Sequence, residues 1–506
     1  MEHPMFTMLD IVLEIILYLS NPERARLLTV NSTFFYAGVR FVWRKLTDFP
    51  QLFAVLDKPT NIPDGYRSPV QITVQEKALI GPRWERFSLY TRCVRELSNL
   101  DLLYARPVLW SGLQQLLSLP PVAPNLRKIV FAWRTNGCTG DLDLWDIARV
   151  FLGPSTSILR CYGDDVHPGL SVDRAGRVLK RAQTVGCNLT DLTLLTDPPG
   201  DEEEIATLAR RISTFERLSQ LRLSPQLVTG TMLDCLHNLP NLEQLTFSTP
   251  IEGRHESRWR SLEIEDGYTE PQFPHLRRLV LSGISCLAIG HLFNTRPLML
   301  QNITLLHVHM SSHRGRESVS PESTAKFFIL VSAHGSRIEN LTVVWPNNLT
   351  QPFTLFPRLL PCLFRLNLRS LALHNVCFPP ESAGISLIHG HWPLLSHLVI
   401  PHQVAWPWDM VQLTERPALK VLHLDFQAVE WRGKIRRRDS TTPIQLCSQF
   451  EIGVTGEEDM RRLASFVSSE GFCYTVGRNS RLYGATSITG GLKIVCHQTS
   501  SDSTLW

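Results

Sequence analysis

An α/β fold is predicted for this chain of 506 residues: a short helical domain, then a solenoid of repeats that each add one strand to a curved parallel sheet with outer helices. Three observations predict it: an apolar opening with helix signals, an apolar pattern that recurs along most of the chain, and a composition typical of a large core. Hydrophobic residues make up 43% of the chain, and the mean hydropathy is −0.04. A chain this long exceeds one ordinary domain unless it is built from repeats.

The recurring pattern is L-x-x-L-x-L, with Ile, Val or Phe allowed at the Leu positions. Starting points are mostly 24 to 35 residues apart, and a Pro-x-Leu preamble often precedes them. A weaker start stands at 94–97, and the long gap after residue 131 is expected to hide a degraded unit around Ile158–Tyr162. The clear units are LRKIVF (126–131), LTDLTL (189–194), LSQLRL (218–223), LEQLTF (242–247), LRRLVL (276–281), ITLLHV (303–308), IENLTV (338–343), LRSLAL (368–373), LSHLVI (395–400) and LKVLHL (419–424).

Units of this kind, in series, resemble long, degenerate leucine-rich repeats. Each strand would point alternate side chains into a shared core, and a helix or loop would return the chain to the next strand. The alternative is a helical stack of HEAT-like repeats, which the Thr, Val and Ser of the expected strands disfavour. We expect a helical domain over 1–48, a connector over 49–92, repeats over 93–430, and a segment of strand, helix and strand over 431–506 that caps the solenoid.

The opening is expected to form three short helices. Thr7 to Asp10 match a capping box for a helix from Met8 to Leu19. Asn21 is expected to cap a second helix with Pro22 at its first position, and Ser32 is expected to cap a third.

The first of these helices is apolar on two faces. An ordinary core face uses Leu9, Val12, Leu13 and Ile16. A second set is apolar as well: Ile11, Ile15, Leu17 and Leu19. A bundle of about 40 residues covers only one such face. The second is therefore predicted to bind a partner by helix-in-groove recognition, or else to pack under the rest of the chain.

The stretch 11–46 resembles an F-box, the module by which substrate receptors of SCF-type cullin–RING ubiquitin ligases hold their adaptor. The family's conserved positions are matched by Ile11, Val12, Glu14, Ile15, Leu19, Val30, Phe34, Val42 and Trp43. Two departures are the missing proline in Thr7-Met8-Leu9-Asp10 and Asn31 where the family has Cys. The resemblance covers about 40 residues. Taken with the repeats, the chain resembles fungal-type F-box proteins with degenerate leucine-rich repeats.

This resemblance implies a substrate receptor that binds a Skp-family adaptor and, through it, a cullin, while the repeats bind a protein substrate. The implied adaptor-binding residues are Leu9, Ile11, Leu13, Glu14, Ile15, Leu19, Val30, Phe34 and Trp43. The alternative function is a leucine-rich-repeat scaffold, unconnected with ubiquitin, whose first helices only cap the solenoid.

The substrate is expected on the concave face of the sheet, which is lined by the residues that alternate with the core leucines. Histidines and tryptophans gather in the later repeats, and interface hot spots favour Trp, Tyr and Arg. The alternative is that these tryptophans fill the core between irregular repeats. The predicted substrate-binding residues are Arg222, His307, His309, Trp345, His374 and His423.

Other classes of function are disfavoured. A net charge of +4 makes no case for nucleic acid or a membrane surface, and the opening lacks the pattern of a signal peptide. Eleven scattered cysteines, the closest pair being Cys362 and Cys377, are typical of reduced thiols in the cytoplasm or nucleus. No motif predicts catalysis or a cofactor, and the histidines of HVHMSSH (307–313) lack the acidic or thiol partners of a metal site.

Overall fold

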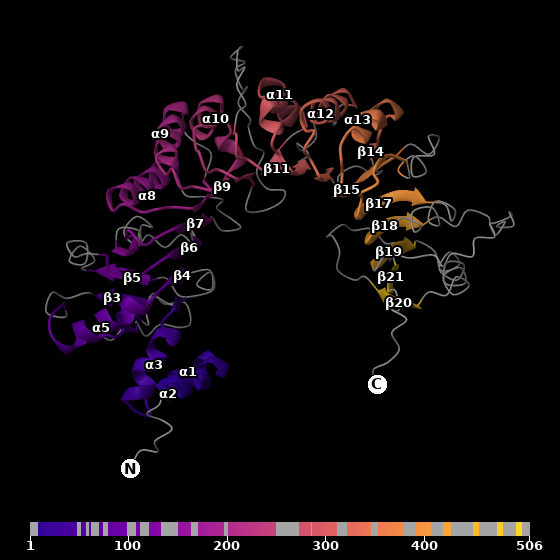
Figure 1. Ribbon diagram of the computed structural model, residues 1–506. Coiled ribbons are helices and arrows are strands. Elements are labelled where there is room, and N and C mark those ends of the chain that lie inside the picture. The colour runs from indigo at the N-terminus through magenta and orange to yellow at the C-terminus, as the bar shows by residue number, and fades with distance from the viewer. Residues whose placement is uncertain are drawn as a thin grey trace. The chain divides into compact units, whose positions relative to one another are not determined.

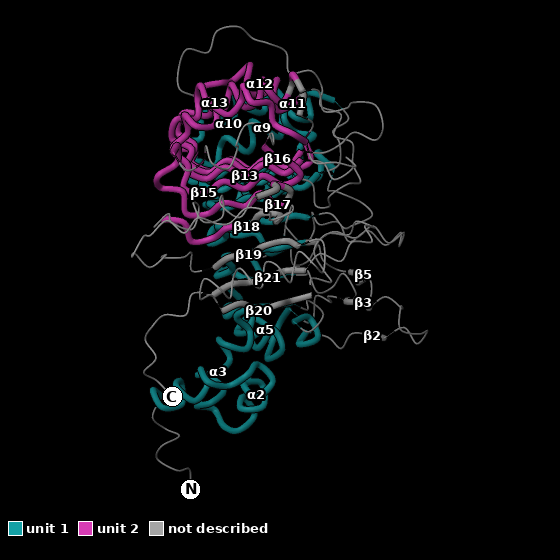
Figure 2. Tube along the Cα trace, turned by 90° about the vertical axis from the view of Figure 1, so that its right-hand side faces the viewer, with its two compact units in different colours: residues 1–254 teal, residues 255–506 magenta. Residues whose placement is uncertain are grey.

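The computed structural model divides into two compact units, Met1–Arg254 and His255–Trp506, which Figure 2 colours separately. Each is described by itself. The structure describes residues 9–47, 52–56, 60–61, 70–73, 79–98, 108–111, 121–132, 150–162, 171–196, 201–248, 273–284, 286–310, 321–345, 353–378, 388, 390–405, 418–426, 449–454, 473–478 and 492–497.

Three helices open the first unit, as the sequence predicts: α1 (Leu9–Tyr18), α2 (Asn21–Leu27) and α3 (Ser32–Val42). Two caps differ from the expected residues. The second helix is capped by Ser20 rather than Asn21, and the Glu23 carboxylate accepts hydrogen bonds from the Ser20 backbone N–H (2.8 Å) and Oγ (2.6 Å). The third is capped by Asn31 rather than Ser32, because the Asn31 Oδ1 accepts from the Phe34 N–H at 2.9 Å. The expected capping box at Thr7 lies outside the described residues.

The core of this helical domain is small. Val12 and Ile16 of α1 pack with Phe34 and Ala37 of α3, and Leu13, Leu27 and Phe41 border them. Leu9, expected on the core face, is instead exposed, because it stands at the first residue of α1.

Arg24 joins α1 to α2. Its guanidinium donates to the carbonyls of Ile16 (2.8 Å) and Leu17 (3.0 Å) in the last turn of α1, and to Asn21 Oδ1 (3.2 Å). The Ile16 carbonyl also accepts from the Leu19 N–H at 3.3 Å. One side chain therefore fixes the angle between two helices.

We expect Arg24→Ala to destabilise the helical domain by about 1–2 kcal/mol, because the Ile16 and Leu17 carbonyls lose the hydrogen bonds that Arg24 donates. Amide hydrogen exchange in α1 measures this, and exchange should become faster. Arg26→Ala, at an exposed position on the same helix, is the control. Equal exchange in both variants would contradict a structural role for Arg24.

The sheet of the first unit is parallel, and its strands follow the chain. Helices α8, α9 and α10 lie along one of its faces (Figure 1). A smaller sheet pairs β2 (Thr60–Asn61) with β3 (Val70–Thr73) and β3 with β5 (Val108–Ser111). The strands of the main sheet, in spatial order, are β1 (Lys45–Leu46), β4 (Glu96–Ser98), β6 (Lys128–Ala132), β7 (Ile158–Tyr162), β8 (Asp191–Leu194), β9 (Gln220–Leu223) and β10 (Gln244–Phe247). The helices are α5 (Pro82–Cys93), α8 (Val172–Thr184), α9 (Glu202–Ser213), the 3₁₀ turn η4 (Pro225–Leu227) and α10 (Gly230–Leu236).

The second unit repeats this plan with α11, α12 and α13 on one face (Figure 1). Its strands, in spatial order, are β11 (Arg278–Ile284), β12 (Leu305–Met310), β13 (Asn340–Val344), β15 (Ser370–His374), β17 (His397–Ala405), β18 (Val421–Phe426), β19 (Gln449–Val454), β21 (Leu492–His497) and β20 (Cys473–Arg478). The first seven are parallel, and the last two pairings are antiparallel. The helices are α11 (Cys286–Thr295), η5 (Pro297–Leu300), α12 (Pro321–His334), η6 (Pro357–Leu359) and α13 (Leu360–Phe364); β14 (Phe353–Thr354) pairs with β16 (Val376–Cys377).

The strands confirm the leucine-rich-repeat α/β class. In each of the ten clear units the strand begins at the third residue of L-x-x-L-x-L, and the Leu positions are buried where their side chains are described. The degraded unit expected at Ile158–Tyr162 is strand β7. Alternation is plain in β12 and β13, where every second side chain is buried against the helices.

The ends of the sheet differ from the expected plan. Strands begin at Lys45, within the range expected to be helical domain, rather than at residue 93. At the other end, β19 continues the parallel ladder, and β21 and β20 add to it in antiparallel fashion. The helix expected within 431–506 lies outside the described residues.

Candidate functional site

Helix α1 exposes a second apolar face, opposite the side that packs into the domain core. Val12 and Ile16 are fully buried, while Ile11 is 36% exposed, Leu17 52% and Tyr18 87%. Ile11 and Tyr18 are seven residues apart, so they lie on the same side of the helix two turns apart. Glu14 falls between them and is exposed. This spacing is the one used by helices that bind in a groove.

Two further apolar side chains of the helical domain are exposed: Val30 after α2, and Tyr36 on α3. We call Ile11, Leu17 and Tyr18 of α1 the exposed apolar face. Singly exposed apolar residues are normal, but several within one 40-residue domain are not needed for its folding. Tyr18 and Tyr36 were not among the predicted adaptor-binding residues. The position of Tyr18, seven residues after Ile11, is the signal that could have identified it.

Other predicted adaptor-binding residues occupy different positions. Phe34 lies in the core and Leu13 borders it, so they hold the domain together. Trp43 stacks on Tyr90 of α5, with ring centroids 4.6 Å apart and planes 8° apart, and so joins α3 to the next helix. Ile15 and Leu19 are half-buried. A buried Phe34 has too little exposed area to contact a partner, and the prediction for this residue is corrected.

The open face of the second unit, opposite its helices, contains the predicted histidines. His307 lies between Val280 and Thr342 on the neighbouring strands. Two residues further along β12, His309 is separated from His374 only by Val344, since His309 pairs with Val344 and Val344 with His374. All three histidines are half-buried. Strand pairing therefore brings these three residues onto one face within a few strands of each other.

Two predicted residues stand apart from this group. Arg222 lies on the open face of the first unit, where its Nε donates to Ser248 Oγ at 2.6 Å. His423 of β18 pairs with Val399 of β17, and the side chain of His423 is outside the described residues.

Trp345 belongs to the core and not to the open face. It is fully buried, between the rings of Phe328 (6.3 Å) and Phe353 (5.2 Å). Trp392 is also buried and meets Phe364 edge to face. A side chain without exposed area cannot contact a bound protein, so the prediction that Trp345 binds substrate is corrected. These tryptophans fill the core between irregular repeats.

Burial is the main cause that lowers the pKa of His307 below its ordinary value, and the nearby His309 and Arg278 lower it further. Below a pH of about 6.5, the pKa of an unperturbed histidine, the unfolded chain then binds more protons than the folded one. The stability of the second unit should therefore fall as the pH falls through this window.

We expect His307→Gln to reduce this loss of stability, because the variant has no imidazole to protonate. Urea midpoints at about pH 7.5 and about pH 5.5 measure it. His275→Gln, at an exposed position in the same unit, is the control. An unchanged difference between the two midpoints in His307→Gln would contradict this origin of the acid sensitivity.

The described residues offer little chemistry beyond binding. Within them no cluster of three or more His, Cys, Asp or Glu could hold a metal ion. Burial raises the pKa of the Cys161 and Cys187 thiols to about 12, so neither is a thiolate nucleophile at neutral pH. Of the helices in the described ranges, none has the length and apolar content to cross a bilayer.

No protein-family model matches the sequence, and no curated protein matches it. Among solved structures, the alignment with the internalin InlF of Listeria monocytogenes covers 75% of this chain and 89% of that one, with 10% identity and a TM-score of 0.30. A TM-score this low does not establish a shared fold. The assignment of the chain to the leucine-rich-repeat α/β class therefore rests on its own strand order, register and alternation of buried leucines.

Proposed function

We propose that this chain is the substrate-recognition subunit of an SCF-type ubiquitin ligase. In this proposal the exposed apolar face binds a Skp-family adaptor, and the open face of the repeats binds the protein to be modified. The observation that carries the proposal is the second apolar face of α1, which the helical domain leaves exposed while Val12 and Ile16 fill its core.

The energetics support this use of the face. Fully burying an exposed apolar side chain contributes about 1.5–3 kcal/mol, in proportion to the area newly covered. Tyr18 and Leu17, and to a smaller extent the 36% exposed Ile11, could therefore supply part of the free energy of a complex. The remainder of the domain would hold α1 in place through Arg24 and through the packing of Val12 and Ile16 on Phe34 and Ala37. Preorganisation of this kind lowers the entropy cost of binding.

The test is affinity purification of the full chain from cells, followed by identification of the proteins that co-purify. The proposal expects a Skp-family adaptor and a cullin in comparable amounts. A variant with aspartate at positions 11 and 18 should lose both partners and still fold. Recovery of neither partner with the unmodified chain would remove the ubiquitin-ligase role and leave the alternative, a repeat scaffold that binds proteins without an adaptor.

The substrate-binding part of the proposal has a separate test. Replacing His307, His309 and His374 together by Ala should reduce the recovery of ubiquitin-modified substrates several-fold, because all three lie on the open face of the second unit. Adaptor binding should be unchanged. Unchanged substrate recovery by a folded variant would move the binding face elsewhere.

A further inference from the structure

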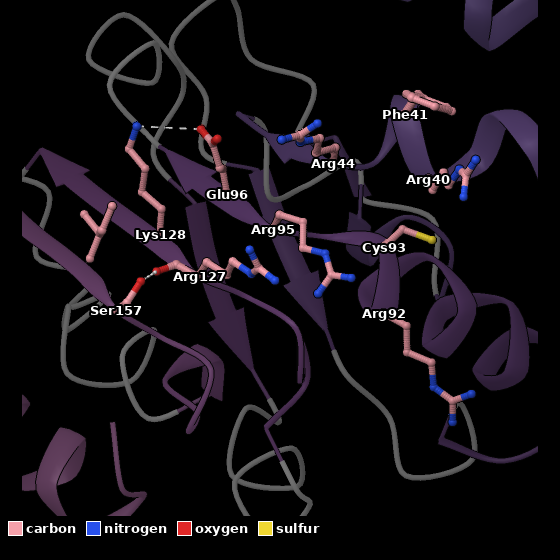
Figure 3. A pocket seen from close by; sticks show the side chains of 11 residues that line it. Arg40, Phe41, Arg44, Arg92, Cys93, Arg95, Glu96, Arg127, Lys128 and Ser157 are labelled. Atoms are coloured by element: carbon pink, nitrogen blue, oxygen red, sulfur yellow. Dashed lines mark hydrogen bonds and ion pairs between the residues drawn. The ribbon is translucent and has the colours of Figure 1, made fainter. Parts of the chain in front are cut away.

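A basic groove of ≈ 650 Å³ lies in the first unit, where α3 and α5 end beside the first strands of the sheet (Figure 3). Its basic lining residues are Arg40, Arg44, Arg92, Arg95, Arg127 and Lys128. Among the described residues that line it, Glu96 is the only acid, and its carboxylate lies 3.7 Å from Lys128 Nζ. The arginines therefore give the described lining of the groove an excess of positive charge.

Parallel strand pairing produces this concentration of charge. Arg44, Arg95 and Arg127 each precede a strand, and these strands are neighbours in the sheet. The Arg95 N–H donates to the Arg44 carbonyl, and the Arg127 N–H to the Arg95 carbonyl, both at 2.8 Å. Neighbouring strands are about 4.8 Å apart, so three arginines follow one another at this spacing along one edge. Arg40 and Arg92 add their charge from the ends of α3 and α5.

The arginines are available to a ligand. Arg40, Arg44, Arg92 and Arg127 are exposed, and within the described residues no carboxylate forms an ion pair with any of them. Arg95 is half-buried, and its guanidinium donates to the Asn125 carbonyl at 3.1 Å. This hydrogen bond holds the Arg95 side chain in place. Arginines that line one groove raise the positive potential there, which favours the binding of an anion.

The run of arginines along this edge of the sheet, Arg44, Arg95 and Arg127, is short. After Arg127, the equivalent residues are Ser157, Thr190 and Ser219, whose hydroxyls donate to the carbonyl of the preceding repeat. The next is Glu243. A long polyanion such as nucleic acid needs a continuous basic track, often with aromatic platforms, whereas this one ends after three repeats. The arrangement suits a compact ligand with several negative charges.

We propose that this groove binds a small, multiply charged phosphate compound. Planar guanidinium groups match phosphate oxygens in paired hydrogen bonds, and several arginines can share one cluster of phosphates. This phosphate site does not depend on the proposed role in a ubiquitin ligase. The groove is formed by residues of this chain, and its test needs no adaptor.

The test is titration calorimetry of the full chain with inorganic tripolyphosphate at low salt. The test variant combines Arg44→Gln, Arg92→Gln and Arg127→Gln, which remove exposed charges and keep Arg95. The control variant removes as many exposed charges elsewhere in the first unit: Lys180→Gln, Arg210→Gln and Arg217→Gln. We expect one-to-one binding that weakens at least about tenfold in the test variant and less than about threefold in the control.

Absence of one-to-one binding by the unmodified chain would overturn the proposal, as would equal weakening in both variants. Tighter binding of a hexaglutamate peptide or a single-stranded oligonucleotide than of tripolyphosphate would also overturn it, in favour of an acidic peptide or a nucleic acid. If the triple variant melts at a lower temperature, Arg44→Gln and Arg92→Gln are tested singly. Unchanged affinity in both single variants would contradict the site.

Discussion

Replacing Ile11 and Tyr18 by aspartate is expected to weaken adaptor binding by more than about a hundredfold. The changes remove the apolar area that Tyr18, and to a smaller extent Ile11, would bury in the complex, and fully burying one such side chain is worth about 1.5–3 kcal/mol. Each change also places an unpaired carboxylate in a dry interface. Because neither side chain belongs to the buried core of the domain, the variant should fold. Titration of the purified adaptor into the full chain measures the change.

The matched control is Ile80→Asp combined with Leu394→Asp. Both are exposed apolar residues outside the helical domain, and Ile80 is 77% exposed. The control should bind the adaptor with unchanged affinity. Equal losses in the two variants would show that charge anywhere on the chain weakens the complex, and the exposed apolar face would then have no special role.

Replacing Trp345 by alanine is expected to destabilise the second unit by about 3–5 kcal/mol, the largest effect on stability among these predictions. The side chain is fully buried, and its ring stacks between Phe328 and Phe353. Its removal leaves a cavity and ends both stacking contacts. Urea unfolding followed by circular dichroism measures the loss, and Trp345→Phe should recover part of it.

Ile329→Ala, at an exposed position on α12, is the control and should change stability by less than about 0.5 kcal/mol. A Trp345→Ala variant with normal stability and poor substrate recovery would reverse the conclusion. Trp345 would then be a contact for the substrate, as the sequence had suggested, and the position of its ring in the core would be wrong.

The repeat strands could be predicted because their signal is local and periodic. A strand with one buried face requires leucine-like residues at alternate positions. The pattern LSQLRL (218–223) therefore predicts both the strand and which of its side chains face the core. Even the irregular unit at Ile158–Tyr162 could be located, from the spacing of its neighbours. The three opening helices were equally clear, since α1 combines an apolar period with a polar stop after Leu19.

Features that depend on long-range contacts could not be predicted. Leu9 and Trp345 are apolar in the sequence, and only packing decides that the first is exposed and the second buried. The caps at Ser20 and Asn31 stand beside other suitable polar residues, so sequence alone left the position uncertain by one residue. The basic groove joins residues from positions 40 to 158, which become neighbours only once β1, β4, β6 and β7 pair.

The central claim, that α1 contacts the adaptor through its exposed face, is tested most directly by site-specific photo-crosslinking. A photoreactive amino acid replaces Tyr18 in one sample and Ile80 in another, and each is irradiated with a bound adaptor. Both positions are well exposed, so reactivity depends on proximity alone. We predict a crosslink to the adaptor from position 18 and none from position 80. A crosslink from position 80 alone, or none from position 18 while the adaptor remains bound, would contradict the claim.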